Sequence, residues 1–171
     1  MKSRTIIVTS LRDAPSQLAH HQASHAIGIL GPDTAHPVFG KLPEAHHLRL
    51  SFHDVAAVTP GLSAPRSGDM TKLLGFLRNW NGPSPLLIHC WAGISRSTAA
   101  GFIAGCLLRP GDDEWLLARE LRQAAPSATP NPLLVALADE ALGRDGRMIA
   151  AIAGIGRGAD AFEGTPFKLA V

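Results

Sequence analysis

The feature that most constrains the fold is an apolar stretch from position 85 to position 108 that is interrupted once. Its first part, PLLIH at 85–89, is a continuous apolar run, as expected for a central strand of a mostly parallel sheet covered on both faces. Its last part, RSTAAGFIAGCLL at 96–108, is apolar on all sides except at its start, which predicts a helix buried in the centre of the domain. Residues 90–95 must then form a tight loop between the two.

The rest of the chain predicts alternating strands and helices. Short β-branched or alternating apolar runs predict three more strands, at 5–9, 24–30 and 48–52. Helical spacing or N-terminal signals predict further helices at 12–22, from 67 to at least 77, at 112–124 and at 131–142. The order strand, helix, strand, strand, helix, strand, followed by three or four helices, predicts an α/β domain with a small, mainly parallel sheet of four to five strands flanked by helices.

Two predicted helices carry recognisable start signals. Asn131 followed by Pro132 fits the N-cap and first-turn positions. Ser67 is the expected N-cap of the helix whose apolar stripe follows, with Asp69 in its first turn. The stripe comprises Met70, Leu73, Leu74 and Leu77.

Composition limits the partners and the compartment. The chain has 171 residues, of which 46% are hydrophobic, so one globular domain with a sizeable core is the simplest arrangement. A formal net charge of +2 without a long run of like charge does not favour nucleic acid or a membrane surface as partner. Two cysteines without CxxC spacing suggest neither a disulfide framework nor zinc. With no signal-peptide core and no spanning apolar run, we expect a cytoplasmic protein.

The loop at 90–95 brings a thiol and a guanidinium to the start of a helix. Unpaired amides and the helix macrodipole attract an anion there, and Gly93 lets the chain bend sharply so that the amides converge. These groups favour the thiolate form of Cys90. Arg96 can grip two oxygens of a tetrahedral oxyanion at once, a geometry that Lys does not match. A thiolate beneath such a cradle predicts phosphoryl transfer through a phosphocysteine.

The motif HCWAGISRS at 89–97 resembles the His-Cys-five residues-Arg-Ser/Thr signature of the cysteine-dependent protein tyrosine phosphatases. The order of elements over residues 5–142 resembles their small dual-specificity-like, bacterial-type branch. The resemblance implies a single phosphatase-like domain over 1–171, with a catalytic core at about 5–142 and a helical or loose extension at 143–171. It also implies hydrolysis of a phosphomonoester on a protein or small molecule, without a cofactor or a metal.

The resemblance assigns a role to each residue of the motif. Cys90 would be the nucleophile, and Arg96 the phosphate clamp and transition-state stabiliser. Ser97 would hydrogen-bond the sulfur and make it a better leaving group, while His89 would hold the loop through its ring nitrogens. Phosphate, sulfate or vanadate would bind the backbone amides of the loop, which are those of Trp91, Ala92, Gly93, Ile94, Ser95 and Arg96.

The family also needs a carboxylic acid that protonates the departing oxygen. Asp54 is the favoured candidate, because it follows the strand at 48–52 at the carboxyl edge of the sheet, where Cys90 is also expected. The loop after it could close over the substrate. Asp69 is the alternative acid, although its place in a helix first turn already accounts for it. Asn131 lies where small phosphatases of this group often have a Pro-Asn pair near the catalytic loop, but a helix cap is the favoured interpretation.

Several alternatives stay open. Members of the family that hydrolyse phosphoinositides usually have a basic loop, so the resemblance, with no lysine at 91–95, disfavours a highly charged inositol substrate. The chain also has no tyrosine and no KNRY-like segment of the kind that tyrosine-specific members use to hold the phenyl ring, so preference for phosphotyrosine over phosphoserine is undecided. A sulfur transferase or arsenate reductase-like enzyme, or a non-catalytic phosphate-binding module, could use a similar loop. Cys106 alone gives poor support to a sulfur transferase or arsenate reductase, and we interpret it as a core residue.

Two further sequence features have simpler explanations than ligand binding. His21 and His25 have the spacing of metal ligands, but no carboxylate or cysteine accompanies them. Residues 154–158 fit a loose segment better than a nucleotide-binding loop.

Overall fold

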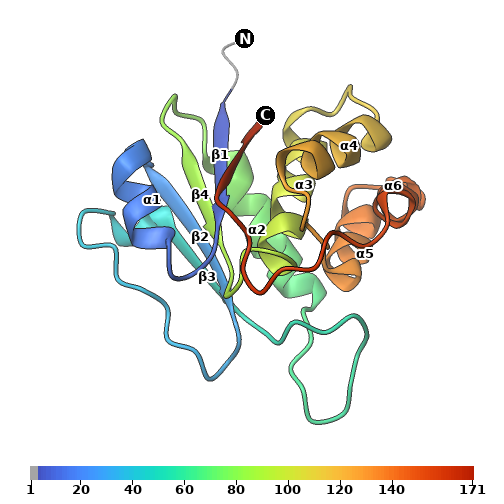
Figure 1. Cartoon of the computed structure of the whole chain (residues 1–171), viewed down its shortest axis with the longest axis horizontal. Coiled ribbons are helices and arrows are strands. Elements are labelled where there is room, and N and C mark those ends of the chain that lie inside the picture. The colour runs from blue at the N-terminus through green and yellow to red at the C-terminus, as the bar shows by residue number, and fades with distance from the viewer. Residues whose placement is uncertain (1–3) are drawn as a thin grey trace.

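A five-stranded sheet forms the centre of the computed structural model, which describes residues 4–171. The strands lie in the order β3-β2-β4-β1-β5 (Figure 1). All neighbouring strands are parallel except β5, which runs antiparallel to β1. The sheet confirms the predicted mainly parallel architecture, and its strands are β1 (Thr5–Thr9), β2 (His25–Leu30), β3 (His47–Ser51), β4 (Leu86–His89) and β5 (Phe167–Ala170).

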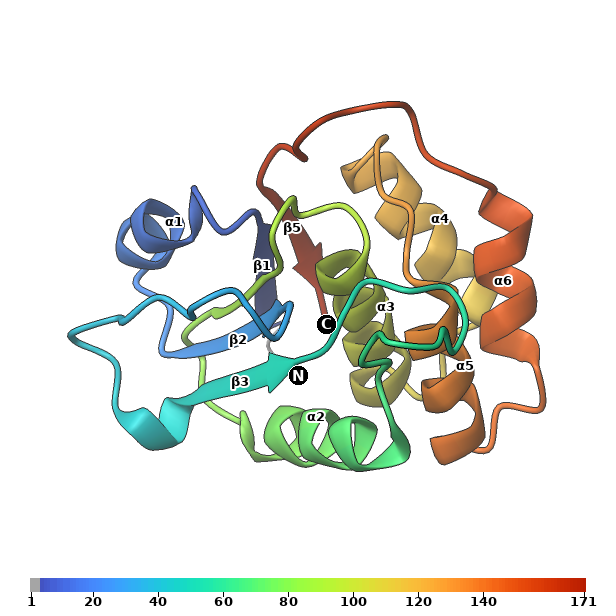
Figure 2. The ribbon, with the colours of Figure 1, turned by 90° about the horizontal axis from the view of Figure 1, so that it is seen from below.

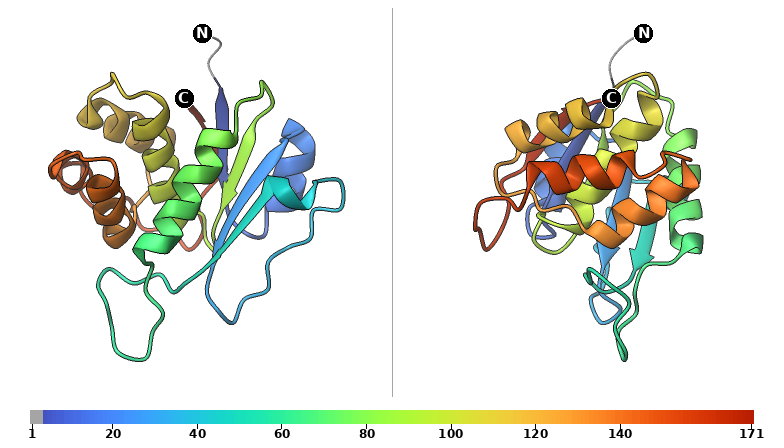
Figure 3. Two further views of the ribbon diagram at one scale, coloured as in Figure 1. Left: turned by 180° about the vertical axis from the view of Figure 1, so that it is seen from behind. Right: turned by 90° about the vertical axis from the view of Figure 1, so that its right-hand side faces the viewer.

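Helices lie on both faces of the sheet. The first helix of the chain covers one face, and the other helices lie on the opposite face (Figures 2 and 3). Alternate residues of β1 divide between the two faces: Ile7 packs with the residues beneath α1, while Ile6 and Val8 join the larger core. The helices are α1 (Ala14–His21), α2 (Ser67–Asn79), α3 (Arg96–Leu108), α4 (Glu114–Ala124), α5 (Pro132–Ala141) and α6 (Arg147–Ile155), with a short 3-10 turn, η1 (Glu44–His46). No helix in the described part of the chain is both long enough and apolar enough to span a bilayer.

Helix α3 is the buried central helix that its composition predicts. Its residues 96–106 are all buried, since it packs against β1 and β4 on one side and against α2, α4 and α5 on the other. Strand β4 lies between β2 and β1 and ends at His89. The loop between β4 and α3 therefore joins the carboxyl edge of the sheet to the N-terminus of a buried helix.

The C-terminal segment corrects one expectation. Residues 143–171 contain the helix α6, but they are not merely a helical or loose extension, because Phe167–Ala170 forms the edge strand β5. Its register places Phe167 opposite Val8 and Leu169 opposite Ile6. A four-residue run gives a weak strand pattern in the sequence, and here the open edge of β1 supplies the hydrogen bonds that stabilise it.

The start of α2 also differs by one residue from the prediction. Ser67 is the first helical residue and Arg66 occupies the N-cap position. The carboxylate of Asp69 accepts a hydrogen bond from the amide of Arg66 over 2.9 Å. Because Asp69 binds that amide, the turn is capped without the hydroxyl of Ser67. The prediction for the other signal is confirmed, since Oδ1 of Asn131 accepts from the amide of Leu134 at the start of α5.

Candidate active site

The loop at 90–95 has its carbonyl groups fixed on the outside. Each of four carbonyls accepts a hydrogen bond from an amide elsewhere in the chain, over 2.8 to 3.2 Å: Trp91 from Leu11, Ala92 from Gly164, Ile94 from Thr129 and Ser95 from Asn131. The amide of Gly93 instead donates to the Sγ atom of Cys90 over 3.2 Å. The Gly93 amide therefore faces the sulfur, while the amides of Trp91, Ala92, Ile94 and Ser95 have no acceptor in the described part of the chain.

Gly93 allows this loop to lie against the end of β1. Its φ of +73° falls in the left-handed region that favours glycine. A Cβ atom at this position would lie 2.9 Å from the amide nitrogen of Ser10 and 2.9 Å from the carbonyl carbon of Thr9. Both the backbone conformation and the close approach therefore require glycine here.

Cys90 lies at the bottom of the loop and is 2% exposed. Its Sγ atom is 3.1 Å from the hydroxyl oxygen of Ser97, in the first turn of α3. Ser97 is fully buried, so this hydroxyl has a fixed position beside the sulfur. The structure thus brings together the thiol, one loop amide and one hydroxyl that the sequence assigned to the same site.

The guanidinium group of Arg96 is also buried, with 7% of the residue exposed. Its Nη1 atom donates to the carbonyl oxygen of Phe52 over 2.9 Å, which fixes the plane of the group. Its Nε atom is buried and has no partner among the described residues. An unsatisfied buried donor costs about 1–3 kcal/mol, and more when it is charged. An anionic oxygen is the partner that best removes this cost.

Asp54 lies beside the loop although 36 positions separate it from Cys90 in the sequence. Its Oδ1 atom accepts a hydrogen bond from the hydroxyl of Ser95 over 2.8 Å. The residue is exposed, so its carboxyl group faces solvent as well as the loop. Asp69, the alternative acid, lies in the first turn of α2 and binds the amide of Arg66. The structure therefore places Asp54, and not Asp69, against the cysteine loop.

Asn131 links three parts of the site, a role that the sequence analysis ranked below helix capping. Its Nδ2 atom donates to Oδ1 of Asp54 over 2.8 Å and to the carbonyl of Val55 over 3.0 Å. Its Oδ1 atom caps α5 at the same time. One buried amide thus performs both functions, because it carries donors on one side and an acceptor on the other.

The side chain of His89 contacts the cysteine loop from the face of the sheet opposite to α3. It is fully buried, and its Nδ1 atom lies 3.3 Å from the carbonyl oxygen of Cys90. Burial lowers the pKa of His89 to about 4, so the ring is neutral at pH 7. A neutral ring can donate to this carbonyl from Nδ1 only if Nε2 carries no proton.

Two exposed aromatic rings stand beside the loop. Trp91 is 50% exposed and Phe162 is 83% exposed, and their ring centroids lie 5.8 Å apart in an edge-to-face arrangement. Together with Leu11, Arg12 and Glu163 they line a surface hollow of about 420 Å³. The sequence analysis missed Phe162, because the segment around it has no regular pattern and only the tertiary structure brings it to Trp91.

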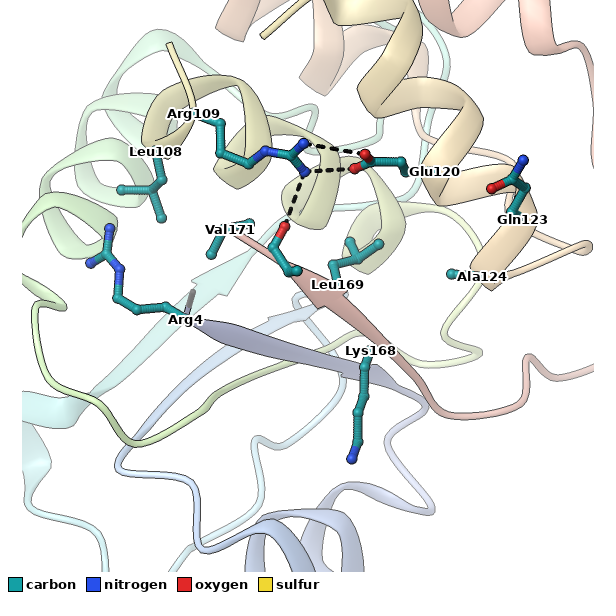
Figure 4. Close-up of a pocket in the computed structure, with 10 residues that line it drawn as sticks. Arg4, Leu108, Arg109, Glu120, Gln123, Ala124, Lys168, Leu169 and Val171 are labelled. Carbon is teal, nitrogen blue, oxygen red and sulfur yellow. Dashed lines mark hydrogen bonds and ion pairs between the residues drawn. The ribbon is translucent and has the colours of Figure 1, made fainter. Parts of the chain in front are cut away.

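A cavity of about 780 Å³ lies elsewhere, between the C-terminal end of α3, α4 and β5 (Figure 4). It contains no residue of the motif at 89–97. Its Arg109 side chain is already bound by Glu120, by Asp112 and by the carbonyl of Ala170. The Arg109 charge is therefore satisfied within the protein, and the lining of the cavity contains no cysteine or histidine.

Comparisons with known proteins show the fold. No family model matches the chain, and no curated protein matches it in sequence. Among solved structures it is similar to human DUSP28 (20% identity, TM-score 0.58, covering 82% of this chain and 94% of that one). It is also similar to DUSP15 (20%, 0.59, 87% and 90%) and to PTPMT1 in complex with PI(5)P (15%, 0.60, 82% and 94%). The chain therefore has the fold of the dual-specificity and tyrosine phosphatase-like proteins.

Proposed function

We propose that this protein is a phosphomonoester hydrolase that acts through a phosphocysteine at Cys90. One observation carries the proposal: several loop amides and the buried Nε atom of Arg96, at the start of α3, have no partners among the described residues and belong to the same segment as the thiol. Such preorganised donors stabilise charge that develops on transferring phosphoryl oxygens. The likeness of the fold to phosphatases supports the same chemistry.

In the first step the Cys90 thiolate attacks phosphorus, so that a sulfur–phosphorus bond forms while the bond to the ester oxygen breaks. The protonated carboxyl group of Asp54 gives its proton to the departing oxygen, and the alcohol leaves. Arg96 and the loop amides hold the three remaining phosphoryl oxygens. The hydrogen bonds from Ser95 and Asn131 keep Asp54 at the rim of the loop during this step.

In the second step a water molecule attacks the phosphocysteine. Asp54, now a carboxylate, takes a proton from the water, the sulfur–phosphorus bond breaks and inorganic phosphate is released. The hydroxyl of Ser97, 3.1 Å from the sulfur, donates a hydrogen bond to the departing thiolate. This bond makes the sulfur a better leaving group at the point where its charge returns.

The substrate class follows from the surroundings of the loop. The absence of lysine between Cys90 and Arg96 argues for a singly phosphorylated protein or small molecule. The rings of Trp91 and Phe162 offer apolar contact to an aromatic or otherwise apolar group that carries the phosphate.

We further infer one domain for residues 1–171, because β5 pairs with β1. The bacterial-type branch and a cytoplasmic location remain predictions.

The experiment is hydrolysis of an aryl phosphate, with vanadate as inhibitor, by the parent chain and four variants. We expect Cys90→Ser to abolish turnover and retain vanadate binding, and Arg96→Lys to lose about 10²–10³ in kcat together with vanadate affinity. Asp54→Asn should slow alkyl phosphates more than aryl phosphates, since poor leaving groups depend most on the acid. Arg119→Lys, on the exposed face of α4, is the matched control and should behave like the parent.

Each alternative has its own outcome in this experiment. Turnover by Cys90→Ser would exclude the covalent step. Binding of a phosphopeptide by the parent chain without release of phosphate would identify a non-catalytic module. Activity with thiosulfate, or with arsenate and a thiol reductant, in place of phosphate esters would identify one of the other enzymes that use a cysteine loop.

A further inference from the structure

Three histidines on different elements direct ring nitrogens toward one another. His36 lies in the connection after β2, His47 begins β3 and His89 ends β4. Nδ1 of His36, Nε2 of His47 and Nε2 of His89 are each buried without a hydrogen-bond partner in the part of the chain that the structure describes. Ligand atoms of the three rings lie within 4.8 Å of one another. Unsatisfied buried nitrogens are rare, and three that converge call for a common partner.

The space between these rings depends on a glycine. Gly28 lies in β2, between β3 and β4, and is in register with His89. A Cβ atom at position 28 would lie 2.7 Å from Nε2 of His89 and 2.8 Å from Nδ1 of His36. Any side chain at this position would therefore occupy the room in which a shared partner of the two nitrogens would sit.

The outer nitrogens show which protons the rings carry. Nδ1 of His89 faces the carbonyl of Cys90, an acceptor, so its proton belongs there and the lone pair is on Nε2. Nε2 of His36 lies 3.4 Å from the hydroxyl of Ser51, which lets Nδ1 present its lone pair. His36 and His89 thus each direct a lone pair into the cluster while the opposite ring nitrogen faces a second group, which is the arrangement of metal-ligating histidines.

A water molecule and a cation would satisfy this arrangement in different ways. Water donates two hydrogen bonds, so it satisfies all three nitrogens only when His47 carries its proton on Nε2, whereas a cation binds the lone pairs of all three rings. The positive charge of Arg49 lies near His36 and His47 and opposes cation binding, but its ion pair with Glu44 offsets that charge. Phe39 packs against His47 and His89 and closes the apolar side of the cluster.

We propose that His36, His47 and His89 bind a zinc-type divalent cation, with water as the fourth ligand. Tetrahedral zinc with nitrogen at about 2.0–2.1 Å needs ligand atoms about 3.3 Å apart. The rings must therefore approach one another by at most about 1.5 Å, and His36 sits on a long connection outside the sheet. The ion ties this connection to β3 and β4, and it fixes the ring of His89, whose other nitrogen faces the cysteine loop.

The test is titration of the EDTA-treated full chain with Co²⁺, a zinc substitute whose visible absorption is strong only in tetrahedral sites. We expect one equivalent to bind and zinc to displace it. His36→Gln and His47→Gln should each weaken binding by more than about 10-fold, since even loss of an outer-shell partner costs 10–100-fold. Gly28→Ala should weaken it as well. His20→Gln, an exposed histidine on α1, is the matched control and should bind like the parent.

Two results would overturn the proposal. One is failure of the parent chain to bind cobalt or zinc stoichiometrically; the other is unchanged affinity in His36→Gln, a substitution in a connection whose loss of a ring should not prevent folding. Nitrogen NMR of the parent chain gives a second readout that needs no variant. Zinc should shift the three assigned ring nitrogens and leave those of His20 unchanged. These measurements do not depend on phosphatase activity, so they stand or fall separately from the proposed function.

Discussion

Asn131 donates a hydrogen bond of 2.8 Å to the carboxylate of Asp54, across 77 positions of sequence. The same oxygen atom accepts a second bond of 2.8 Å from Ser95, within the cysteine loop. The proposed acid is therefore tied to the start of α5 and to the oxyanion cradle together. This arrangement orients the carboxyl group before the substrate arrives, so that less of its freedom remains to be lost in the transition state.

The first prediction concerns this contact. Asn131→Ser keeps a residue type that caps helices well but removes the amide that reaches Asp54. We expect kcat to fall by about 10-fold for alkyl phosphates, less than the roughly 10²–10⁴ expected for loss of the acid itself, and to fall less for aryl phosphates. Steady-state kinetics with the two substrate classes checks this. Equal losses for both would show that Asn131 does not act through Asp54.

Ser97 is expected to act in the second step alone. Ser97→Ala removes the hydroxyl beside the sulfur and should slow breakdown of the phosphocysteine by about 10–10²-fold. Stopped-flow release of an aryl alcohol should then show a burst followed by a slow steady state. Ser67→Ala, at the exposed start of α2, is the control. A variant with slowed steady-state turnover and no burst would place the role of Ser97 in the first step instead.

The two cysteines should differ in reactivity. Burial raises the pKa of Cys106 to about 12, so this thiol stays protonated at pH 7. The sulfur of Cys90 instead lies 3.1 Å from the Ser97 hydroxyl and accepts a hydrogen bond from the Gly93 amide, at the base of the proposed phosphate cradle. Iodoacetamide at pH 6–7 should modify Cys90 in the native chain and leave Cys106 intact, with vanadate protecting Cys90; mass spectrometry of the peptides measures both. Equal slow labelling of the two would remove the basis for a nucleophilic Cys90.

Gly93 and Gly61 form a matched pair for the loop geometry. Both have positive φ, at +73° and +79°, but no atom lies within 4 Å of a Cβ added at Gly61, while the backbone at 9–10 is in the way at Gly93. Gly61→Ala should lower the free energy of unfolding by about 1–2 kcal/mol. Gly93→Ala should lower the free energy of unfolding by about 1–3 kcal/mol more than Gly61→Ala does, and it should abolish vanadate binding. Chemical denaturation checks the energies, and similar losses would argue against the tight contact.

The exposed rings of Trp91 and Phe162 should matter for aromatic substrates. Trp91→Ala removes an aromatic contact worth about 1 kcal/mol, so KM for aryl phosphates should rise about fivefold while KM for small alkyl phosphates stays unchanged. Trp115→Ala is the control, because that tryptophan is also about half exposed (46%) but lies on α4. An equal rise for both kinds of ester would show that the ring supports the loop instead of contacting substrate.

The sequence predicts best the features that nearest neighbours determine. The strand and helix around the cysteine loop follow from a run of apolar residues, and Asn131 with Pro132 marks a helix start at its observed position. Features that depend on distant partners are harder to infer. Strand β5 exists because β1 offers an edge, and the contact of Asn131 with Asp54 depends on how two loops meet.

The histidines show the same limit. The spacing of His21 and His25 in the sequence is that of metal ligands. The structure instead places His36, His47 and His89 together, and these three have no regular spacing. A sequence pattern reports which residues share a face of one element, whereas this cluster draws on two strands and a connection. The histidines of β3 and β4 come close because of the register of these strands with β2, which carries Gly28 between them.

The pairing of β5 with β1 has a consequence for biosynthesis. During translation Cys90 emerges early, but the carbonyl of Ala92 obtains its donor only once Gly164 has been made, and β1 gains its outer neighbour only after Phe167. A nascent polypeptide halted near position 142 would carry the whole motif with its cradle incompletely braced. Vectorial synthesis thereby delays the complete bracing of the loop until β5, the last strand of the chain, has been made.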